Sequence, residues 1–218
     1  NYGTSWNEVN NGLTSKYIRS IVVSGTNLFA GTSISSSFVG GIFLSTNNGT
    51  NWISVNNGLT NQDVYSLGVS GTSIFAGTQY GGVFLSENIG TNWRSVGLTI
   101  QTVYAMAESG TNIFAGTKAG VYLSANNGVS WTCVKSSLSV TALAVLGTNI
   151  YAGTTAGVYM STNNGANWIQ TTLNNRWIWT FAVSGTNIFA GSYDGGVYLS
   201  TNYGTSWNEV NNGLTSKY

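Results

Sequence analysis

Few side chains in this sequence could carry acid–base or metal chemistry. The chain has no histidine, a single cysteine (Cys133) and six carboxylates, so serine–histidine–aspartate triads and the usual zinc ligand sets are excluded. Asp63 and Asp194 occupy loops that we expect on one face of the fold, and two carboxylates across a glycosidic bond can hydrolyse it. They belong to different repeats, however. We therefore expect no catalytic residue, metal or cofactor, and we keep a hydrolase only as the third hypothesis.

Aromatic and basic side chains form the better candidate site. They fall at the second position of a recurring alternating segment, or in the connection before it. Aromatic faces suit the C–H faces of sugar rings, while polar groups bond the hydroxyls. The simpler interpretation, which we favour, is that these side chains line a channel or pack between sheets. The candidate ligand-binding residues are Arg19, Tyr65, Tyr104, Arg176, Trp177 and Trp179.

Internal repeats must position these side chains. Five repeats each contain a close variant of S-T-N-N-G-T-N-W, and a truncated sixth copy opens the chain. Repeats of about 40 residues dictate the architecture of a whole fold. The repeated tryptophans are Trp6, Trp52, Trp93, Trp131, Trp168 and Trp207.

Each repeat predicts four short strands. An alternating run such as residues 64–70 is followed by a G-T-N or G-T-S turn, then by I-F-A-G-T, then by G-V-F-L-S, and a fourth strand begins at the tryptophan. The Ala-Gly pair of the second strand predicts close backbone packing. Four antiparallel strands in about 40 residues match one propeller blade. We therefore predict an all-β, five-bladed β-propeller of four-stranded antiparallel blades, with residues 1–218 forming a single domain.

The repeated string S-x-N-x-G-x-[TNS]-W resembles the Asp-box, or BNR repeat, of β-propellers such as sialidases and xyloglucanases. The family's aspartate is replaced by asparagine in every unit, and asparagine can still form the turn. The resemblance implies that Ser and Asn hold the turn, Gly takes positive φ, and Trp packs between sheets. The sialidase arginine triad, tyrosine and acidic partner have no recognisable counterpart, so sialidase activity is not implied.

Composition excludes several other classes. The chain has 29 glycines, no proline and only 6% charged residues, with 42% hydrophobic residues. This composition is poor in residues that favour helices and too hydrophobic for a disordered chain. A net charge of +1 gives no field to attract nucleic acid, and no apolar run is long enough for membrane insertion. We interpret Cys133 as a small buried apolar residue.

The two ends of the chain carry the same segment. Residues 1–17 and 202–218 both read N-Y-G-T-S-W-N-E-V-N-N-G-L-T-S-K-Y. This identity indicates an engineered overlap, a recent duplication or one period of a longer array. If a propeller closes by pairing its last blade with a strand from the other terminus, the two copies compete for one place. The spare copy would then recruit a partner chain or lie along its own ring.

From this segment we expect self-association. The predicted function is a non-catalytic structural or adhesive module that forms oligomers or filaments through its terminal strands. The alternative is a lectin-like propeller that binds a glycan. The polar, weakly charged composition favours an extracellular or secreted protein. The loops between second and third strands also vary, from residues 33–40 to residues 118–120, which indicates a tolerant recognition face.

Overall fold

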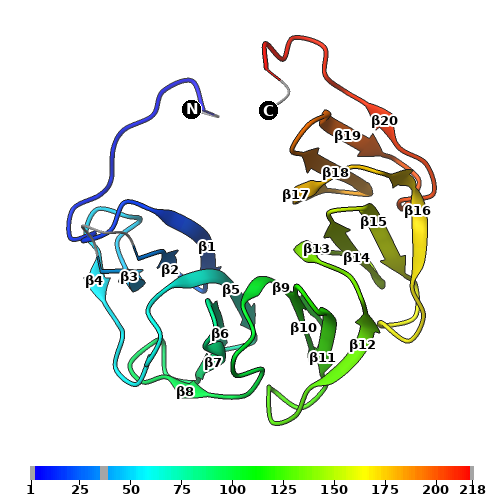
Figure 1. Ribbon diagram of the computed structural model, residues 1–218. Coiled ribbons are helices and arrows are strands. Elements are labelled where there is room, and N and C mark those ends of the chain that lie inside the picture. The colour runs from blue at the N-terminus through cyan, green and yellow to red at the C-terminus, as the bar shows by residue number, and fades with distance from the viewer. Residues whose placement is uncertain (1–2, 35–38, 217–218) are drawn as a thin grey trace.

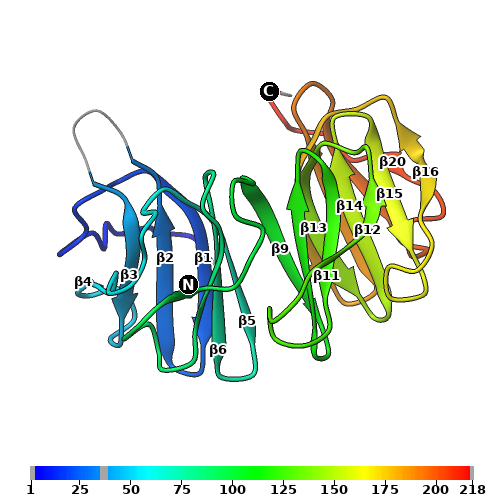
Figure 2. The same ribbon diagram turned by 60° about the horizontal axis from the view of Figure 1, so that its bottom comes forward.

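The computed structural model describes residues 3–34 and 39–216, and every regular element in them is a β-strand. Twenty strands form five antiparallel sheets of four, each assembled in chain order. The sheets stand side by side around a common centre, as the blades of a propeller do (Figures 1 and 2). The prediction of a five-bladed, all-β propeller with four-stranded blades is therefore confirmed.

Blades 1 to 5 comprise β1–β4, β5–β8, β9–β12, β13–β16 and β17–β20. The first strands are β1 (Ile18–Ser24), β5 (Val64–Ser70), β9 (Val103–Ser109), β13 (Val140–Leu146) and β17 (Ile178–Ser184). The second strands are β2 (Asn27–Thr32), β6 (Ser73–Thr78), β10 (Asn112–Thr117), β14 (Asn149–Thr154) and β18 (Asn187–Ser192). The third strands are β3 (Gly41–Ser45), β7 (Gly82–Ser86), β11 (Gly120–Ser124), β15 (Gly157–Ser161) and β19 (Gly196–Ser200). The fourth strands are β4 (Ile53–Ser54), β8 (Arg94–Ser95), β12 (Thr132–Ser136), β16 (Ile169–Asn174) and β20 (Asn208–Glu209).

The fourth strands begin one residue after the repeated tryptophan, rather than at it. The turn before each tryptophan is held as expected. In blade 1 the Ser45 hydroxyl donates to Asn47 Oδ1 (3.0 Å) and accepts from the amide of Gly49 (2.9 Å), which has a φ of 83°. Asn47 Oδ1 also accepts from the amide of Asn51 at 2.9 Å. The turn therefore needs an acceptor at residue 47 but no charge.

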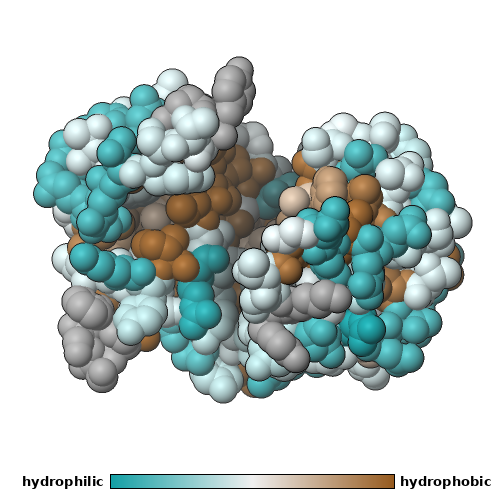
Figure 3. Space-filling view, turned by 90° about the horizontal axis from the view of Figure 1, so that it is seen from above, coloured by the Kyte–Doolittle hydropathy of each residue, from teal (hydrophilic) through white to brown (hydrophobic). Residues whose placement is uncertain are grey.

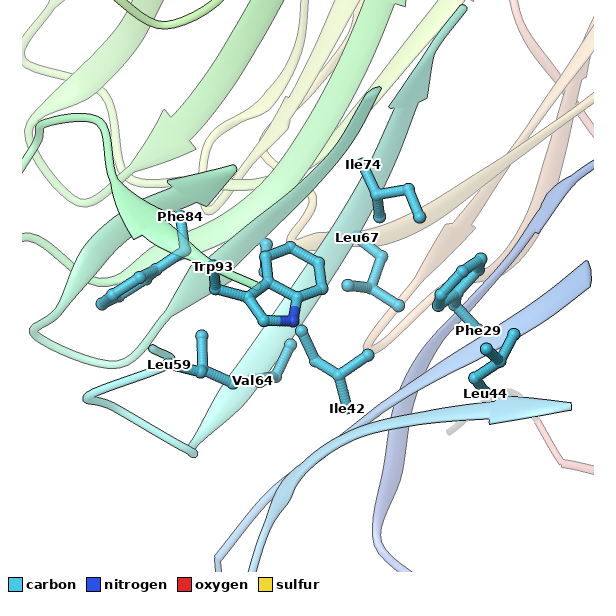
Figure 4. Packing of buried hydrophobic residues seen from close by; sticks show 10 residues of the cluster. Phe29, Ile42, Leu44, Leu59, Val64, Leu67, Ile74, Phe84 and Trp93 are labelled. Atoms are coloured by element: carbon cyan, nitrogen blue, oxygen red, sulfur yellow. The ribbon is translucent and has the colours of Figure 1, made fainter. Parts of the chain in front are cut away.

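Neighbouring blades pack through interlocking apolar faces. Between blades 1 and 2, Phe29, Ile42 and Leu44 meet Val64, Leu67 and Ile74 in one buried cluster (Figure 4). Each such side chain contributes about 1.5–3 kcal/mol when fully buried. The predicted close approach at the Ala-Gly pairs is confirmed, because a Cβ added at Gly31 would lie 2.7 Å from Val64 Cγ1. The blades are therefore held together by contacts with their immediate neighbours.

The repeated tryptophans pack as expected, with one exception. Trp52 and Trp93 are 7% and 4% exposed, and the next three are partly buried. Trp6 is 89% exposed, so the prediction that all six tryptophans pack between sheets is wrong there. The reason is that Trp6 belongs to the N-terminal segment, which has no sheet of its own. Cys133 is likewise exposed, because it lies on β12 at the outer edge of blade 3, and the prediction of burial is wrong.

The ring of blades is open. The first strands of consecutive blades contact one another from β1 to β17, whereas blades 1 and 5 face each other across an opening (Figure 1). The C-terminal copy of the repeated segment supplies β20 to blade 5. Residues 3–17 of the N-terminal copy contain no strand and lie on blade 1. The two copies therefore do not compete for one place in the same chain, because each has its own blade.

Candidate functional site

A pocket of about 490 Å³ lies where the first strands of all five blades converge. Each blade contributes at least one side chain to it, so the pocket depends on the whole arc rather than on one blade. Five of the six predicted ligand-binding residues line it, and Arg176 does not. The lining residues are Arg19, Tyr65, Tyr104, Lys118, Ser139, Thr141, Thr155, Trp177 and Trp179.

Blade 5 contributes an aromatic platform. The rings of Trp177 and Trp179 are stacked with centroids 5.0 Å apart and an interplanar angle of 19°. Tyr193 packs against both, with centroids 5.2 Å from Trp177 and 6.2 Å from Trp179. Trp177 and Trp179 are 36% and 49% exposed. A half-exposed pair of indoles held by a third ring offers a rigid apolar surface for stacking.

Blades 1 to 3 supply the opposite wall. Tyr65 and Tyr104 meet edge to face with centroids 5.5 Å apart, and the Arg19 guanidinium lies 5.1 Å from the centre of the Tyr65 ring. Arg19 Nε also donates to the Ser33 hydroxyl at 2.7 Å. Cation–π contact and a hydrogen bond thus fix the guanidinium at the pocket. Partial burial, and secondarily the nearby Asp63 carboxylate, raise the pKa of Tyr65.

The charged side chains that line the pocket are all positive. Among the described lining residues, Arg19 and Lys118 are cationic and none is a carboxylate. The walls therefore combine aromatic faces, hydroxyls and positive charge. Such a lining can stack on a flat or ring-shaped ligand and pair with an anionic group.

Arg176 is held away from the pocket. Its Nε donates to the Tyr198 hydroxyl at 2.9 Å, and Tyr198 in turn donates to Glu209 at 3.2 Å. The hydrogen bond to Tyr198 raises the pKa of Arg176 further. These two hydrogen bonds link the connection before blade 5 to β19 and β20. Arg176 therefore acts within blade 5, and its neighbour Trp177 reaches the pocket.

The two carboxylates considered for catalysis do not meet in one pocket. Asp63 lines a separate hollow beside Ile34 and Tyr80, and its Oδ1 accepts from the Ile34 amide at 3.2 Å. Asp194 lies in the β18–β19 loop of blade 5 and is not among the described residues of that hollow. Across residues 3–34 and 39–216, no three acidic or cysteine side chains are grouped to hold a metal.

Sequence reasoning missed some members of the site. Tyr193 supports the tryptophan platform, and Lys118 and Thr155 line the pocket. All three lie at or just after the end of a second strand, in the variable connection to the third. For Tyr193 and Lys118, the available indication was an aromatic or basic residue in such a loop, whereas Thr155 gave none. The longest such loop was predicted at residues 33–40, of which residues 35–38 lie outside the described residues.

Comparison with known proteins gives the fold but no family. No family model and no curated protein match the chain. An ancestral GH74 enzyme is 24% identical, with a TM-score of 0.78 over 99% of this chain. The extracellular domain of BT4673 from B. thetaiotaomicron is 20% identical, with a TM-score of 0.69 over 84%. YCF48 bound to D1 peptide is 15% identical, with a TM-score of 0.63 over 88%.

These structures are propeller-type proteins. The chain spans 33%, 27% and 65% of their respective lengths, so each of them continues beyond the part that is similar. At these identities the likeness concerns the fold alone. In the described part of the chain, no helix has the length and apolar character to span a membrane.

Proposed function

We propose that this chain is a non-catalytic, extracellular propeller module that assembles head to tail with further copies of itself, in a structural or adhesive role. One observation carries the proposal: the two ends of the open ring expose apolar side chains of the kind that is buried where two blades meet. Hydrophobic surface gathers on both sides of the opening (Figure 3). A contact between two different faces continues from copy to copy without closing.

The face of blade 5 matches the faces that bind a following blade. Phe189, Val197 and Leu199 are partly exposed. Their counterparts Phe75, Val83 and Leu85 in blade 2 are at most 1% exposed, because blade 3 covers them. Blade 5 therefore presents the same apolar surface with no blade packed against it among the described residues.

The face of blade 1 matches the faces that bind a preceding blade. Ile18 is 37% exposed and Ile21 is 60% exposed. Val64 and Leu67, their counterparts in blade 2, are 0% and 5% exposed, because they pack against blade 1. Four junctions of this type already exist within the chain. A fifth junction, between blade 5 of one copy and blade 1 of the next, would bury both exposed faces.

Light scattering over a range of concentrations tests the proposal. We expect the mass of the full chain to rise with concentration, and Ile21→Asp to stay monomeric because it places a charge in the junction. Val129→Asp is the matched control. Val129 is 75% exposed and lies in the box turn of blade 3, the repeated segment 124–131 that ends at Trp131, away from both end faces. A full chain that remains monomeric throughout would refute the proposal. A version lacking residues 202–218 should also lose assembly.

The absence of catalysis is part of the proposal. It is supported by the lack of histidine and by the placement of Asp63 and Asp194 away from a shared pocket. The extracellular setting is supported by the polar, weakly charged composition. The GH74 neighbour is an enzyme, so a hydrolase assay on a panel of polysaccharides is the direct check. We expect no release of reducing ends.

A second candidate function is glycan binding in the central pocket, and the stacked Trp177–Trp179 pair favours it. Aromatic platforms bind the C–H faces of sugars, and Arg19 with Lys118 would add affinity for sugars that carry a carboxylate. Tryptophan fluorescence with neutral and acidic sugars tests this. We expect acidic sugars to perturb the emission, Trp179→Ala to lose the response and Trp6→Phe to keep it. No response across the panel would reject the candidate.

A further inference from the structure

The N-terminal segment, residues 3–17, occupies a defined place on blade 1. The Trp52 indole donates to the carbonyl of Val9 at 2.8 Å, and the Trp52 amide donates to the carbonyl of Asn11 at 2.8 Å. Leu13 packs against the cluster of Ala30, Phe43 and Trp52. The segment is therefore bound by specific hydrogen bonds as well as apolar contact.

The same contacts recur where blade 2 meets blade 1. The Trp93 indole donates to the carbonyl of Val55 at 2.7 Å, and the Trp93 amide donates to the carbonyl of Asn57 at 2.8 Å. Leu59 is 4% exposed in that junction. Val55, Asn57 and Leu59 come from the segment that follows the fourth strand of blade 1. The N-terminal segment therefore takes the place that the end of a preceding blade takes elsewhere in the chain.

A preceding blade would cover more of blade 1 than this segment does. The segment reaches Phe43 on β3 and Trp52 just before β4, but Ile21 on β1 stays 60% exposed. Leu67, the counterpart of Ile21, is 5% exposed because a complete blade precedes it. The N-terminal segment thus supplies the outer half of a blade junction and leaves the inner half open.

The C-terminal copy has the same sequence and is attached to a complete blade. Val210, Asn212 and Leu214 repeat Val9, Asn11 and Leu13. Val210 and Leu214 are 40% and 47% exposed. If this copy replaced the N-terminal segment of another chain, the hydrogen bonds on Trp52 would be exchanged for identical ones. Blade 5 would then also bury Ile18 and Ile21 of that chain, so the exchange gains apolar contact at the cost of association.

Building on the proposed head-to-tail assembly, we propose that the N-terminal segment, residues 3–17, is an exchangeable cap. In a single chain the cap covers the outer half of blade 1. In a junction between chains, the C-terminal copy of one chain displaces the cap of the next and brings blade 5 against blade 1. The partner is a second copy of this chain. The cap sets the protein concentration at which that second copy binds to blade 1.

Matched substitutions in the two identical copies test the cap. Leu13→Asp weakens only the cap, whereas Leu214→Asp weakens only the incoming copy. Burying a leucine completely is worth roughly a tenfold change in an equilibrium constant or more. Leu13 is partly buried, and aspartate in its place would also set a charge against the apolar cluster, so we expect Leu13→Asp to assemble at about tenfold lower concentration than the unaltered chain. Leu214→Asp should need about tenfold higher concentration. Light scattering measures both, and circular dichroism checks that both variants keep the β-sheet spectrum.

A synthetic peptide of residues 1–17 gives a test without any substitution. A truncated version that lacks residues 1–17 should assemble at a lower concentration than the full chain, because its blade 1 has no cap. The peptide added to this truncated version should occupy blade 1 and raise the concentration needed for assembly. If the full chain, the two variants and the truncated version assemble at the same concentration and the peptide has no effect, self-assembly is supported but the proposed cap is refuted. If the version lacking residues 1–17 stays monomeric and folded while the full chain assembles, the C-terminal copy has closed its own ring, which also overturns the proposal. If no version assembles, the proposed function fails as well.

Discussion

The carboxyl of Glu108, on β9 of blade 3, lies directly against Gly68, on β5 of blade 2. A Cβ added at residue 68 would overlap Glu108 Oε1. Among the described residues, this oxygen is the one buried side-chain oxygen or nitrogen without a hydrogen-bond partner. The other four blades have valine where blade 3 has Glu108, and only blade 2 has glycine where Gly68 stands. The missing side chain at residue 68 makes room for the carboxyl.

Burial of Glu108 predicts that stability depends on pH. Desolvation raises the pKa of this carboxyl from 4.5 to about 7, although the backbone amides of Val69 and Glu108 oppose the shift. The folded state therefore holds the proton more tightly than the unfolded state. The resulting stabilisation of the folded state is about 3 kcal/mol. It is fully present below pH 4.5 and is lost as pH rises through 7.

Urea unfolding at pH 5 and pH 8 measures this dependence. Glu108→Gln keeps the size of the side chain and removes its titration, so we expect the difference between the two pH values to shrink by most of that amount. Glu87→Gln is the control, because the Glu87 side chain is exposed in an ion pair with Arg94. An equal pH dependence in Glu108→Gln and the unaltered chain would contradict the burial argument.

The repeated tryptophans should differ sharply in their contribution to stability. Trp93 is buried between blades and its indole donates to Val55, so Trp93→Ala should cost about 3–5 kcal/mol of unfolding free energy. Trp6 is almost fully exposed, and Trp6→Ala should change stability by less than about 0.5 kcal/mol. Thermal unfolding of the two variants compares them directly. Similar losses would mean that Trp6 is also packed.

The box turn should depend on acceptor oxygens rather than on charge. Ser86 is buried, and its hydroxyl bridges Asn88 and the Gly90 amide. Ser86→Ala leaves that amide without its partner and should cost about 1–3 kcal/mol. Asn88→Asp keeps the oxygen that accepts from Ser86 and the Asn92 amide, so it should be nearly neutral. A large loss in Asn88→Asp would show that the amide group itself is needed.

The single cysteine should be open to reagents in the folded protein. Cys133 is exposed on β12, so a thiol reagent should modify one group per chain without denaturant. Cys133→Ser should abolish labelling and leave stability unchanged within about 0.5 kcal/mol. Protection of the thiol until the chain unfolds would place Cys133 in the interior after all.

The repeats made most of the architecture predictable, and particular positions show why the rest was not. Residues 64–70 alternate with period two and form β5 over that same range. Trp6 and Trp52 share a local motif, yet only Trp52 has a sheet behind it. Burial of the tryptophan therefore depends on which blade packs next to the motif in the folded structure. No local motif indicated the opening of the ring, because one repeat of the sequence fixes its own blade and not the angle to the next blade.

The candidate site was predictable in its members but not in its arrangement. Varying positions at the start of the first strands indicated Tyr65, Tyr104 and Trp179, and these line one pocket. Arg176 and Trp177 are adjacent in the sequence and separate in role, because Arg176 bonds to Tyr198. A sequence alone does not tell which of two neighbours points inward. Cys133 was misplaced for the same reason, since its strand has one inward and one outward face.

Because each blade rests only on the one before and the one after, loss of order should spread inward from the two ends. The middle sheet has support on both sides, whereas the terminal sheets have it on one. Amide hydrogens on β10 and β11 should therefore exchange with solvent more slowly than those on β2 or β18. The protein would then behave less like an all-or-none domain than like a short stack that frays.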